Sequence, residues 1–286
     1  MSSNHVESRD PIRGARRAPL WCWPVLAVVV GAGTVFLNQV FLPGRSWRPI
    51  WDATNGWVHP TLLGGLLVLG LALLVLVAGA RIPPRDLGLQ ASKVPAALLY
   101  GVLLWGFVQV FVTGWGVVAG GRPDFHGSWT GPGIPGGSLL GQLLGNALME
   151  EVLYRGFVFA QLVLLLGGKG RVALPRLLLV ALLASVIFAV SHVPNRIMKD
   201  LYSEPFDVVR DQGMLLLSGT LLALMYWRTR NLPFVVVVHS LTNRPTMAFE
   251  LPDGFPVPPE AVAFGGGLLA TLLWPRLPLT GRGGRG

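Results

Sequence analysis

Two adjacent carboxylates, Glu150 and Glu151, lie inside an apolar run that extends from about Leu139 to Leu166. An ionisable group at membrane depth is costly and is normally kept for function or for an internal partner. Arg155 follows Glu151 by four residues, so these two share a helical face and we expect them to form an ion pair. Glu150 points about 100° away around the helix and has no partner within the run. Such a carboxylate can take a proton from water and return it to a leaving group.

Candidate partners for Glu150 lie in two later apolar runs. His192 ends one of them, in the sequence Phe188-Ala-Val-Ser-His192, and shares a helical face with Phe188. His239 and Asn243 lie one turn apart on one face of the other. Buried polar groups need hydrogen-bond partners in a membrane, and the simplest common solution is that they meet one another. We therefore predict a cluster of one acid, two imidazoles and one carboxamide, contributed by three helices.

Other reactive side chains are less suited to chemistry. His59 and His126 lie at the border of an apolar run and in a loop, where a solvated histidine is expected. Cys22 is the only cysteine, which excludes an internal disulfide and a thiolate metal site. Ser191 and Ser240 each neighbour one of the candidate histidines, but adjacent helical residues point about 100° apart and cannot bond as nucleophile and base. A serine or cysteine nucleophile is therefore not expected.

Besides a glutamate that activates water without a metal, two alternatives stay open: a metal site and a non-enzymatic role. One glutamate and two histidines also form the ligand set of many catalytic zinc sites, so a divalent metal such as zinc, held by Glu150, His192 and His239, is one alternative. The chain has no His-Glu-x-x-His helix, and we favour a glutamate-activated water without a cofactor. Polar residues can also join membrane helices without any chemistry, or they can relay protons. A non-enzymatic transporter or partner-binding scaffold is the competing function.

The composition places these residues in a membrane protein. The chain has 286 residues, of which 52% are hydrophobic and 13% charged, whereas soluble domains carry about 25% charged residues. Its net charge is +9, but the basic residues cluster in short connections between apolar runs. That pattern favours membrane lipid, not nucleic acid, as the partner of the positive charge. We predict an all-α, polytopic membrane protein in which about eight transmembrane helices enclose a polar cavity.

The predicted spans alternate with polar connections. They cover residues 20–42, 59–80, 94–119, 138–167, 177–193, 214–227, 232–249 and 261–274. Lys and Arg are about twice as frequent in the connections on the amino-terminal side as in those on the opposite side, which predicts that both termini are cytoplasmic. The same count places His192 near the non-cytoplasmic end of its span. We expect a multi-pass protein of the plasma membrane.

Three motifs carry a resemblance to a known family. They are Glu150-Glu151-x-x-x-Arg155, Phe188-x-x-x-His192 and His239-x-x-x-Asn243. In this order, each on a hydrophobic span, they resemble the signature of the CPBP (Abi) family of intramembrane proteases, which includes CAAX prenyl endopeptidases and bacteriocin-processing or immunity proteins. The resemblance covers about residues 138–250. Together with the composition, it divides the chain into a disordered cytoplasmic tail (1–18), amino-terminal transmembrane helices (19–120), a protease core (138–275) and a flexible tail (276–286).

The resemblance implies endopeptidase activity and a role for each motif residue. Glu150 and His192 would hold and activate the water, and His239 and Asn243 would donate hydrogen bonds to the developing oxyanion. The supporting residues it implies are Glu151, Arg155 and Phe188. The implied substrate is a membrane-associated peptide or protein, prenylated or bacteriocin-like. An immunity or binding member without activity is the alternative within the family, and the sequence does not predict an oligomeric state.

Overall fold

The structure is a computed structural model that describes residues 12, 14–131, 133–166, 172–251 and 256–274. Within these residues the chain is all-α, apart from an isolated β-bridge between Phe125 and Phe249, and the predicted fold class is confirmed. Helical segments that are long and apolar enough to cross a membrane cover Cys22–Gly44, Pro60–Gly79, Ala91–Val118, Leu174–Met198 and Pro205–Thr229. Two shorter apolar helices cover Leu232–Asn243 and Pro259–Leu273. The carboxylate-bearing segment, Gly133–Leu166, is continuously helical and accounts for the remaining predicted span.

The helices have the following bounds. The α-helices are α1 (Cys22–Phe36), α2 (Leu42–Gly44), α3 (Arg48–Ala53), α4 (Pro60–Leu73), α5 (Val94–Val118), α6 (Gly133–Leu140), α7 (Ala147–Glu151), α8 (Ala160–Leu166), α9 (Leu174–Met198), α10 (Pro205–Thr229), α11 (Leu232–Asn243) and α12 (Pro259–Leu273). The π-helical segments are Leu37–Phe41, Leu74–Gly79, Gly141–Asn146 and Val152–Phe159. Short 3₁₀ helices cover Pro84–Leu87, Ala91–Lys93 and Gly127–Thr130.

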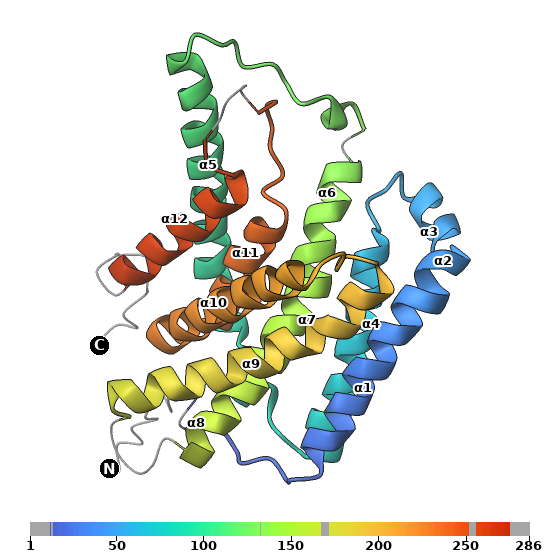
Figure 1. The fold of residues 1–286 in the computed structure, drawn as a ribbon, viewed down its shortest axis with the longest axis vertical. Coiled ribbons are helices and arrows are strands. Elements are labelled where there is room, and N and C mark those ends of the chain that lie inside the picture. The colour runs from blue at the N-terminus through green and yellow to red at the C-terminus, as the bar shows by residue number, and fades with distance from the viewer. Residues whose placement is uncertain (1–11, 13, 132, 167–171, 252–255, 275–286) are drawn as a thin grey trace, which may run out of the picture.

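The bundle is built from two sets of helices (Figure 1). α1, α4, α5 and the helix that runs through α6, α7 and α8 stand upright in this view, while α9 and α10 pack against each other and cross in front of them. α11 contacts α5, α7 and α12, which brings its polar end close to the carboxylate-bearing helix. Residues from three distant parts of the sequence thus meet near the middle of the bundle.

Glycine lets α4 and the carboxylate-bearing helix approach at backbone distance. A Cβ added to Gly145 would lie 2.6 Å from the carbonyl oxygen of Thr61, and one added to Gly65 would overlap the backbone of Gly145. Small residues are the usual means of close packing between membrane helices, because lipid provides no hydrophobic force that drives them together. This contact fixes the depth and rotation of the segment that carries Glu150.

Three predicted boundaries are wrong. α9 does not end at Pro194 but continues to Met198, and α10 begins at Pro205 instead of Met214, so the polar connection predicted between these two spans is mostly helical. Arg196 Nε donates a hydrogen bond to Asp211 Oδ1 at 3.2 Å, which joins the polar ends of the two helices. A capping box at Glu204 also begins α10 earlier than hydropathy indicates. The seventh predicted span, 232–249, is helical only to Asn243.

The predicted tails lie largely outside the described residues. This holds for all of 276–286 and for most of 1–18. The last residues of the amino-terminal segment are attached to the body of the protein. The backbone N–H of Arg16 donates to Asp86 Oδ2 (2.8 Å), and that of Ala18 donates to Gln161 Oε1 (2.9 Å). Gln161 Nε2 donates in turn to the carbonyl of Arg16 (2.8 Å).

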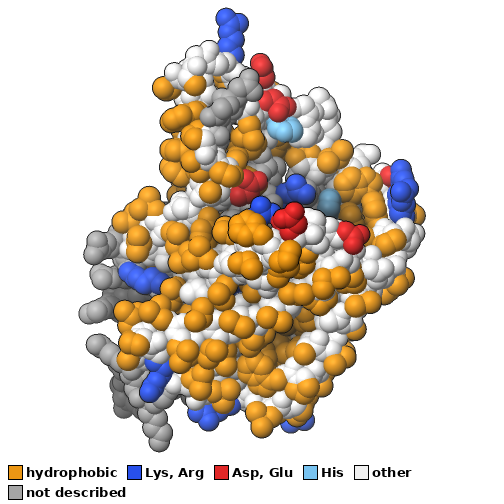
Figure 2. Space-filling view, viewed as in Figure 1, with side chains coloured by type: hydrophobic (Ala, Val, Ile, Leu, Met, Phe, Trp, Pro, Cys, Tyr) orange, Lys and Arg blue, Asp and Glu red, His pale blue; other side chains and the backbone are white. Residues whose placement is uncertain are grey.

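The surface has the distribution expected of a membrane protein (Figure 2). A broad face of hydrophobic side chains dominates this view, with Lys and Arg along its lower edge. On α9 the exposed residues include Leu178, Leu179, Leu182 and Val186. A soluble monomer rarely exposes an apolar surface this extensive. Charged and histidine side chains gather instead around a hollow above that face.

Candidate active site

The two carboxylates lie on a short α-helical segment between two π-helical ones. α7 holds Glu150 and Glu151, and the π-helical stretches Gly141–Asn146 and Val152–Phe159 flank it. π-helical insertions are frequent at functional sites, because they rotate side chains out of the regular α-helical register. Glu150 is 7% exposed and Glu151 is fully buried. Both charges therefore depend on protein partners.

Glu151 is held by two basic groups. Its Oε1 accepts a hydrogen bond from Arg155 Nη1 at 3.0 Å, which is the expected ion pair, and another from His239 Nδ1 at 2.7 Å. Arg155 Nη2 also donates to the carbonyl of Gly219 on α10 at 3.2 Å, and its guanidinium lies 4.5 Å from the ring centroid of Phe188. Glu151 and Arg155 therefore join α7, α9, α10 and α11, with their charges neutralised inside the protein.

Glu150 faces both candidate histidines. Its Oε1 lies 3.7 Å from His192 Nε2, and its Oε2 lies 3.6 Å from His239 Nε2. These separations exceed the length of a direct hydrogen bond, and Glu150 Oε2 has no hydrogen-bond partner in the described part of the chain. Polar contacts of this length often include a water molecule. The structure thus brings together three of the four residues predicted to do chemistry around one incompletely bonded carboxylate.

Hydrogen bonds on the far side of each imidazole fix how it faces Glu150. His192 Nδ1 lies 2.8 Å from the carbonyl oxygen of Phe188, an acceptor, and His239 Nδ1 bonds to Glu151. Each Nδ1 therefore carries a proton, and each Nε2 is directed at Glu150. The ring of Phe188 packs edge-on against His192, with centroids 4.5 Å apart. Phe188 and Glu151 orient the two histidines.

Asn243 lies at the rim of the same cluster. Its Nδ2 donates to Gln142 Oε1 at 3.1 Å, so one amide proton is engaged and the other is available. Gln142 and Asn146 precede Glu150 by eight and four residues. This spacing places polar side chains on one helical face and could have identified both from the sequence. Neither was predicted as a site residue.

A polar cavity of about 430 Å³ contains the cluster. Its volume is within the range of typical small-molecule and cofactor sites. The polar and charged side chains that line it are Thr61, Gln142, Asn146, Glu150, His192, Asn195, Arg196, Lys199, Ser218, His239, Thr242, Asn243 and Arg244. All four predicted catalytic residues are among them, whereas His59 and His126 are not.

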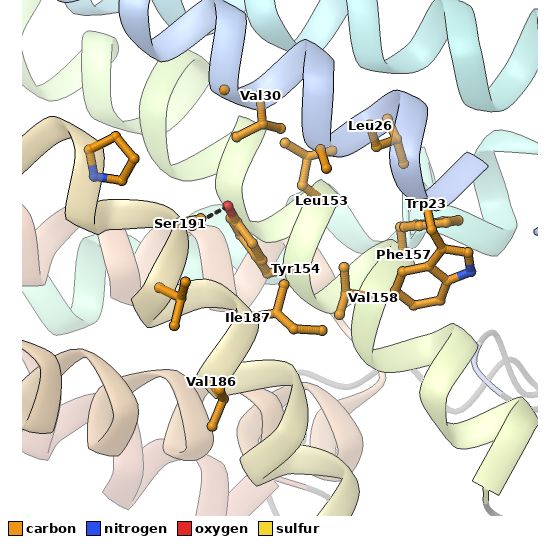
Figure 3. Close-up of a pocket in the computed structure, with 14 residues that line it drawn as sticks. Trp23, Leu26, Val30, Leu153, Tyr154, Phe157, Val158, Val186, Ile187 and Ser191 are labelled. Carbon is orange, nitrogen blue, oxygen red and sulfur yellow. Dashed lines mark hydrogen bonds between the residues drawn. The ribbon is translucent and has the colours of Figure 1, made fainter. Parts of the chain in front are cut away.

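An apolar groove lies beside Tyr154 and Ser191 (Figure 3). It has a volume of about 510 Å³ and runs between α1 and α9, with Trp23, Leu26 and Ile187 among its walls. At its inner end the hydroxyl of Tyr154 donates to Ser191 Oγ at 2.5 Å.

A smaller cavity of about 110 Å³ adjoins the groove. It shares Tyr154 and Ser191 with the groove, and Glu150 and His192 also line it. Ser191 Oγ itself donates to the carbonyl of Phe188, and Ser240 Oγ donates to that of Val236. Both serine hydroxyls are thus engaged with their own helices, and Glu150 lines both the smaller cavity and the polar cavity.

The donor types at the cluster are those of a zinc site. One carboxylate and two imidazoles are common zinc ligands. In the part of the chain that the structure describes, however, no three His, Cys, Asp or Glu side chains are grouped so that they could hold a metal ion. No step of the chemistry below is therefore routed through a metal.

Comparison with known proteins gives a family match over the region that holds the site. Residues 134–244 match the family of type II CAAX prenyl endopeptidases, Rce1-like. The matched region contains the three motifs and the helices α6–α11, which confirms the resemblance predicted from the sequence. No curated protein and no solved structure matches the chain.

Proposed function

We propose that this chain is an intramembrane endopeptidase in which Glu150 activates a water molecule for attack on a peptide bond. The observation that carries the proposal is the Glu150 carboxylate, which lies 3.6–3.7 Å from two imidazole Nε2 atoms in a polar cavity of a membrane protein. Structural polar contacts between helices have no need of an acid that lines such a cavity. The family match supports endopeptidase activity in general terms.

The proposed reaction assigns a proton path to the cluster. Water bound between Glu150 and His192 gives a proton to Glu150 while its oxygen bonds to the peptide carbonyl carbon. The oxyanion that forms accepts hydrogen bonds from Asn243 and from His239 in its protonated form. The C–N bond then breaks, and Glu150 passes the proton to the leaving nitrogen. The products are a carboxylic acid and an amine, and Glu150 returns to its initial state.

The apolar groove supports a substrate that carries a hydrocarbon chain. The groove is bounded by lipid-facing helices, and it shares Tyr154 and Ser191 with the small cavity that Glu150 lines. A hydrocarbon chain seated against Leu26 and Ile187 would leave an attached peptide near Tyr154 and Ser191, which also line the small cavity that contains Glu150. Burial of such a chain contributes roughly 0.8 kcal/mol per CH₂ group. This geometry favours a lipid-modified peptide, of which a prenylated one is an example.

Peptidomics tests the proposed activity directly. Membranes that contain the wild type are compared with membranes that contain Glu150→Ala, and we expect cleaved peptides only with the wild type. Glu260, an exposed acid at the start of α12, gives the matched control Glu260→Ala, which should cleave as the wild type does. The Glu150→Ala protein should retain its expression level and thermal stability. Equal loss of folding and activity would favour a structural cluster instead.

Metal dependence and transport are tested on the purified chain. Protein with a measured metal content is assayed with and without a chelator, and we expect unchanged cleavage. Silencing by the chelator, with recovery on addition of zinc, would assign Glu150, His192 and His239 as ligands. Flux that depends on a pH gradient in vesicles, without any cleaved peptide, would support a transporter.

A further inference from the structure

A buried amide inside a membrane span bonds to the segment that follows α11. Gln109 lies in α5, is 6% exposed and belongs to a part of the chain outside the family match. Its Oε1 accepts a hydrogen bond from the backbone N–H of Ala248 at 2.8 Å, and its Nε2 donates to Met247 Sδ at 3.6 Å. Trp105 lies four residues earlier on the same helical face, and its Nε1 donates to the carbonyl of Thr246 at 3.0 Å. Two side chains of α5 thus hold three successive residues.

The segment that they hold, residues 244–250, contains a strained turn. α11 ends at Asn243, and Thr246 has a φ of 52°, which lies in the left-handed region. A β-branched residue rarely adopts this conformation, because its side chain crowds the backbone there. Such strain persists only where surrounding contacts impose it, and it is concentrated at functional sites. The bonds from Trp105 and Gln109 are contacts of this kind.

A loop holds the later part of the same segment. Trp129 Nε1 donates to the carbonyl of Met247 at 2.9 Å, and the backbone N–H of His126 donates to the carbonyl of Ala248 at 2.9 Å. Irregular backbone in a membrane protein needs internal partners of this kind. Of the bonds from α5 and this loop, the one nearest to Asn243 along the chain is made by Trp105. The start of the segment therefore depends on α5 more than on the loop.

We propose that Trp105 and Gln109 are positioning residues, which fix the carboxamide of Asn243 by holding the turn that follows it. The inference rests on the proposed function, in which Asn243 donates to the oxyanion, and it adds α5 to that machinery. Asn243 is exposed in the polar cavity and is the last residue of its helix, so the direction of the chain after it affects where its amide points. A displacement of about 1 Å in a catalytic group can cost roughly 10²-fold in rate.

Kinetics of paired variants test this inference. Gln109→Met keeps a long side chain but leaves the N–H of Ala248 without its acceptor, and Trp105→Phe removes the bond to Thr246. With a farnesylated peptide as substrate, we expect each to lower kcat about tenfold with little change in KM, because a misplaced oxyanion donor weakens binding of the transition state and not of the substrate. In an Asn243→Ala background the same two substitutions should have almost no further effect, because the group that they position is absent.

Hydrogen exchange measures the same contact without catalysis. In the full chain in detergent, Gln109→Met should speed the exchange of backbone amides in residues 243–250 about tenfold and leave that of α9 and α10 unchanged. Gln39→Met is the matched control, because Gln39 is an exposed amide in another membrane span, and it should change neither this exchange nor kcat. A rise of exchange throughout the chain, with equal losses of kcat in the wild-type and Asn243→Ala backgrounds, would indicate a general loss of stability and overturn the inference.

The positioning role and the protease can fail separately. If Asn243→Ala impairs cleavage but Gln109→Met and Trp105→Phe do not, the positioning role is wrong and the protease stands. If the wild type cleaves no peptide, the protease proposal loses its support. Exchange then decides alone: a rise confined to residues 243–250 in Gln109→Met would still assign the placement of Asn243 to α5, and an unchanged rate would refute it.

Discussion

At the scale of single residues, two adjacent glutamates have different surroundings. Glu151 is fully buried and accepts hydrogen bonds from Arg155 and His239, whereas Glu150 lines a polar cavity and lies 3.6–3.7 Å from two imidazole nitrogens. A peptide-bond hydrolase of this kind needs one acid that reacts and another that holds the reacting groups in place. The two neighbours are suited to these separate tasks.

This difference predicts opposite outcomes for two isosteric substitutions. Glu150→Gln should reduce turnover by about 10²–10⁴-fold, the usual contribution of a general acid–base group, and leave the thermal midpoint nearly unchanged. Glu151→Gln should reduce turnover and also destabilise the fold by roughly 3–5 kcal/mol, because it leaves the buried guanidinium of Arg155 without its counter-charge. Thermal unfolding in detergent, measured beside the activity, checks both. A Glu151→Gln protein as stable as the wild type would contradict this assignment.

The sequence predicted the members of the cluster better than their contacts. Spacing indicated that Glu151 pairs with Arg155 and that Glu150 needs partners elsewhere, because both statements depend only on helix geometry. It did not indicate that Glu151 also bonds to His239, since that contact depends on how α7 and α11 pack. Lys199 and Arg244 were missed for a related reason. Charged residues just beyond an apolar run normally indicate a membrane border, and only the fold shows that these two line a cavity.

At the scale of helices, the position of Glu150 depends on a glycine contact. A side chain at Gly145 would collide with the backbone of α4 near Thr61. We expect Gly145→Leu to destabilise the protein by about 1–3 kcal/mol, as overpacking typically does, and to reduce activity further by moving α7. Gly70→Leu is the matched control, because a Cβ there meets nothing within 4 Å although Gly70 also belongs to α4. Equal thermal midpoints for the two variants would show that the contact is unimportant.

Hydropathy predicts the apolar spans but not every helix boundary. Pro194 removes one backbone donor, and the sequence after it becomes polar, so an end of the helix was expected there. α9 nevertheless continues, because the polar ends of α9 and α10 bond to each other through Arg196 and Asp211. The apolar spans at Pro60–Gly79 and Val94–Val118 were predicted closely, since each is a long apolar run between turn residues. Polar contacts between two helices, such as the one between Arg196 and Asp211, leave no local signal in the sequence.

At the scale of the whole molecule, the distribution of charge predicts an orientation. We propose that the connection before α5 is cytoplasmic and that the loop after it is not, because α5 spans the distance between them. In a Cys22→Ser background, Asp124→Cys should react with a membrane-impermeant maleimide in intact cells, and Ser92→Cys should react only after lysis. Both positions are exposed, and Cys22 is buried. The reverse pattern would place the polar cavity on the cytoplasmic side.

The apolar groove and the polar cavity differ in more than the parts of a substrate that we propose they bind. One is bounded by hydrophobic walls near lipid-facing helices, and the other is lined by charged and amide side chains. After hydrolysis, the fragment with the hydrocarbon chain would diffuse back into the bilayer, and the short polar fragment would diffuse into water. The two new ends would then occupy different phases and could not easily meet again. Cleavage would be driven toward completion by this separation, without any input of energy from a nucleotide.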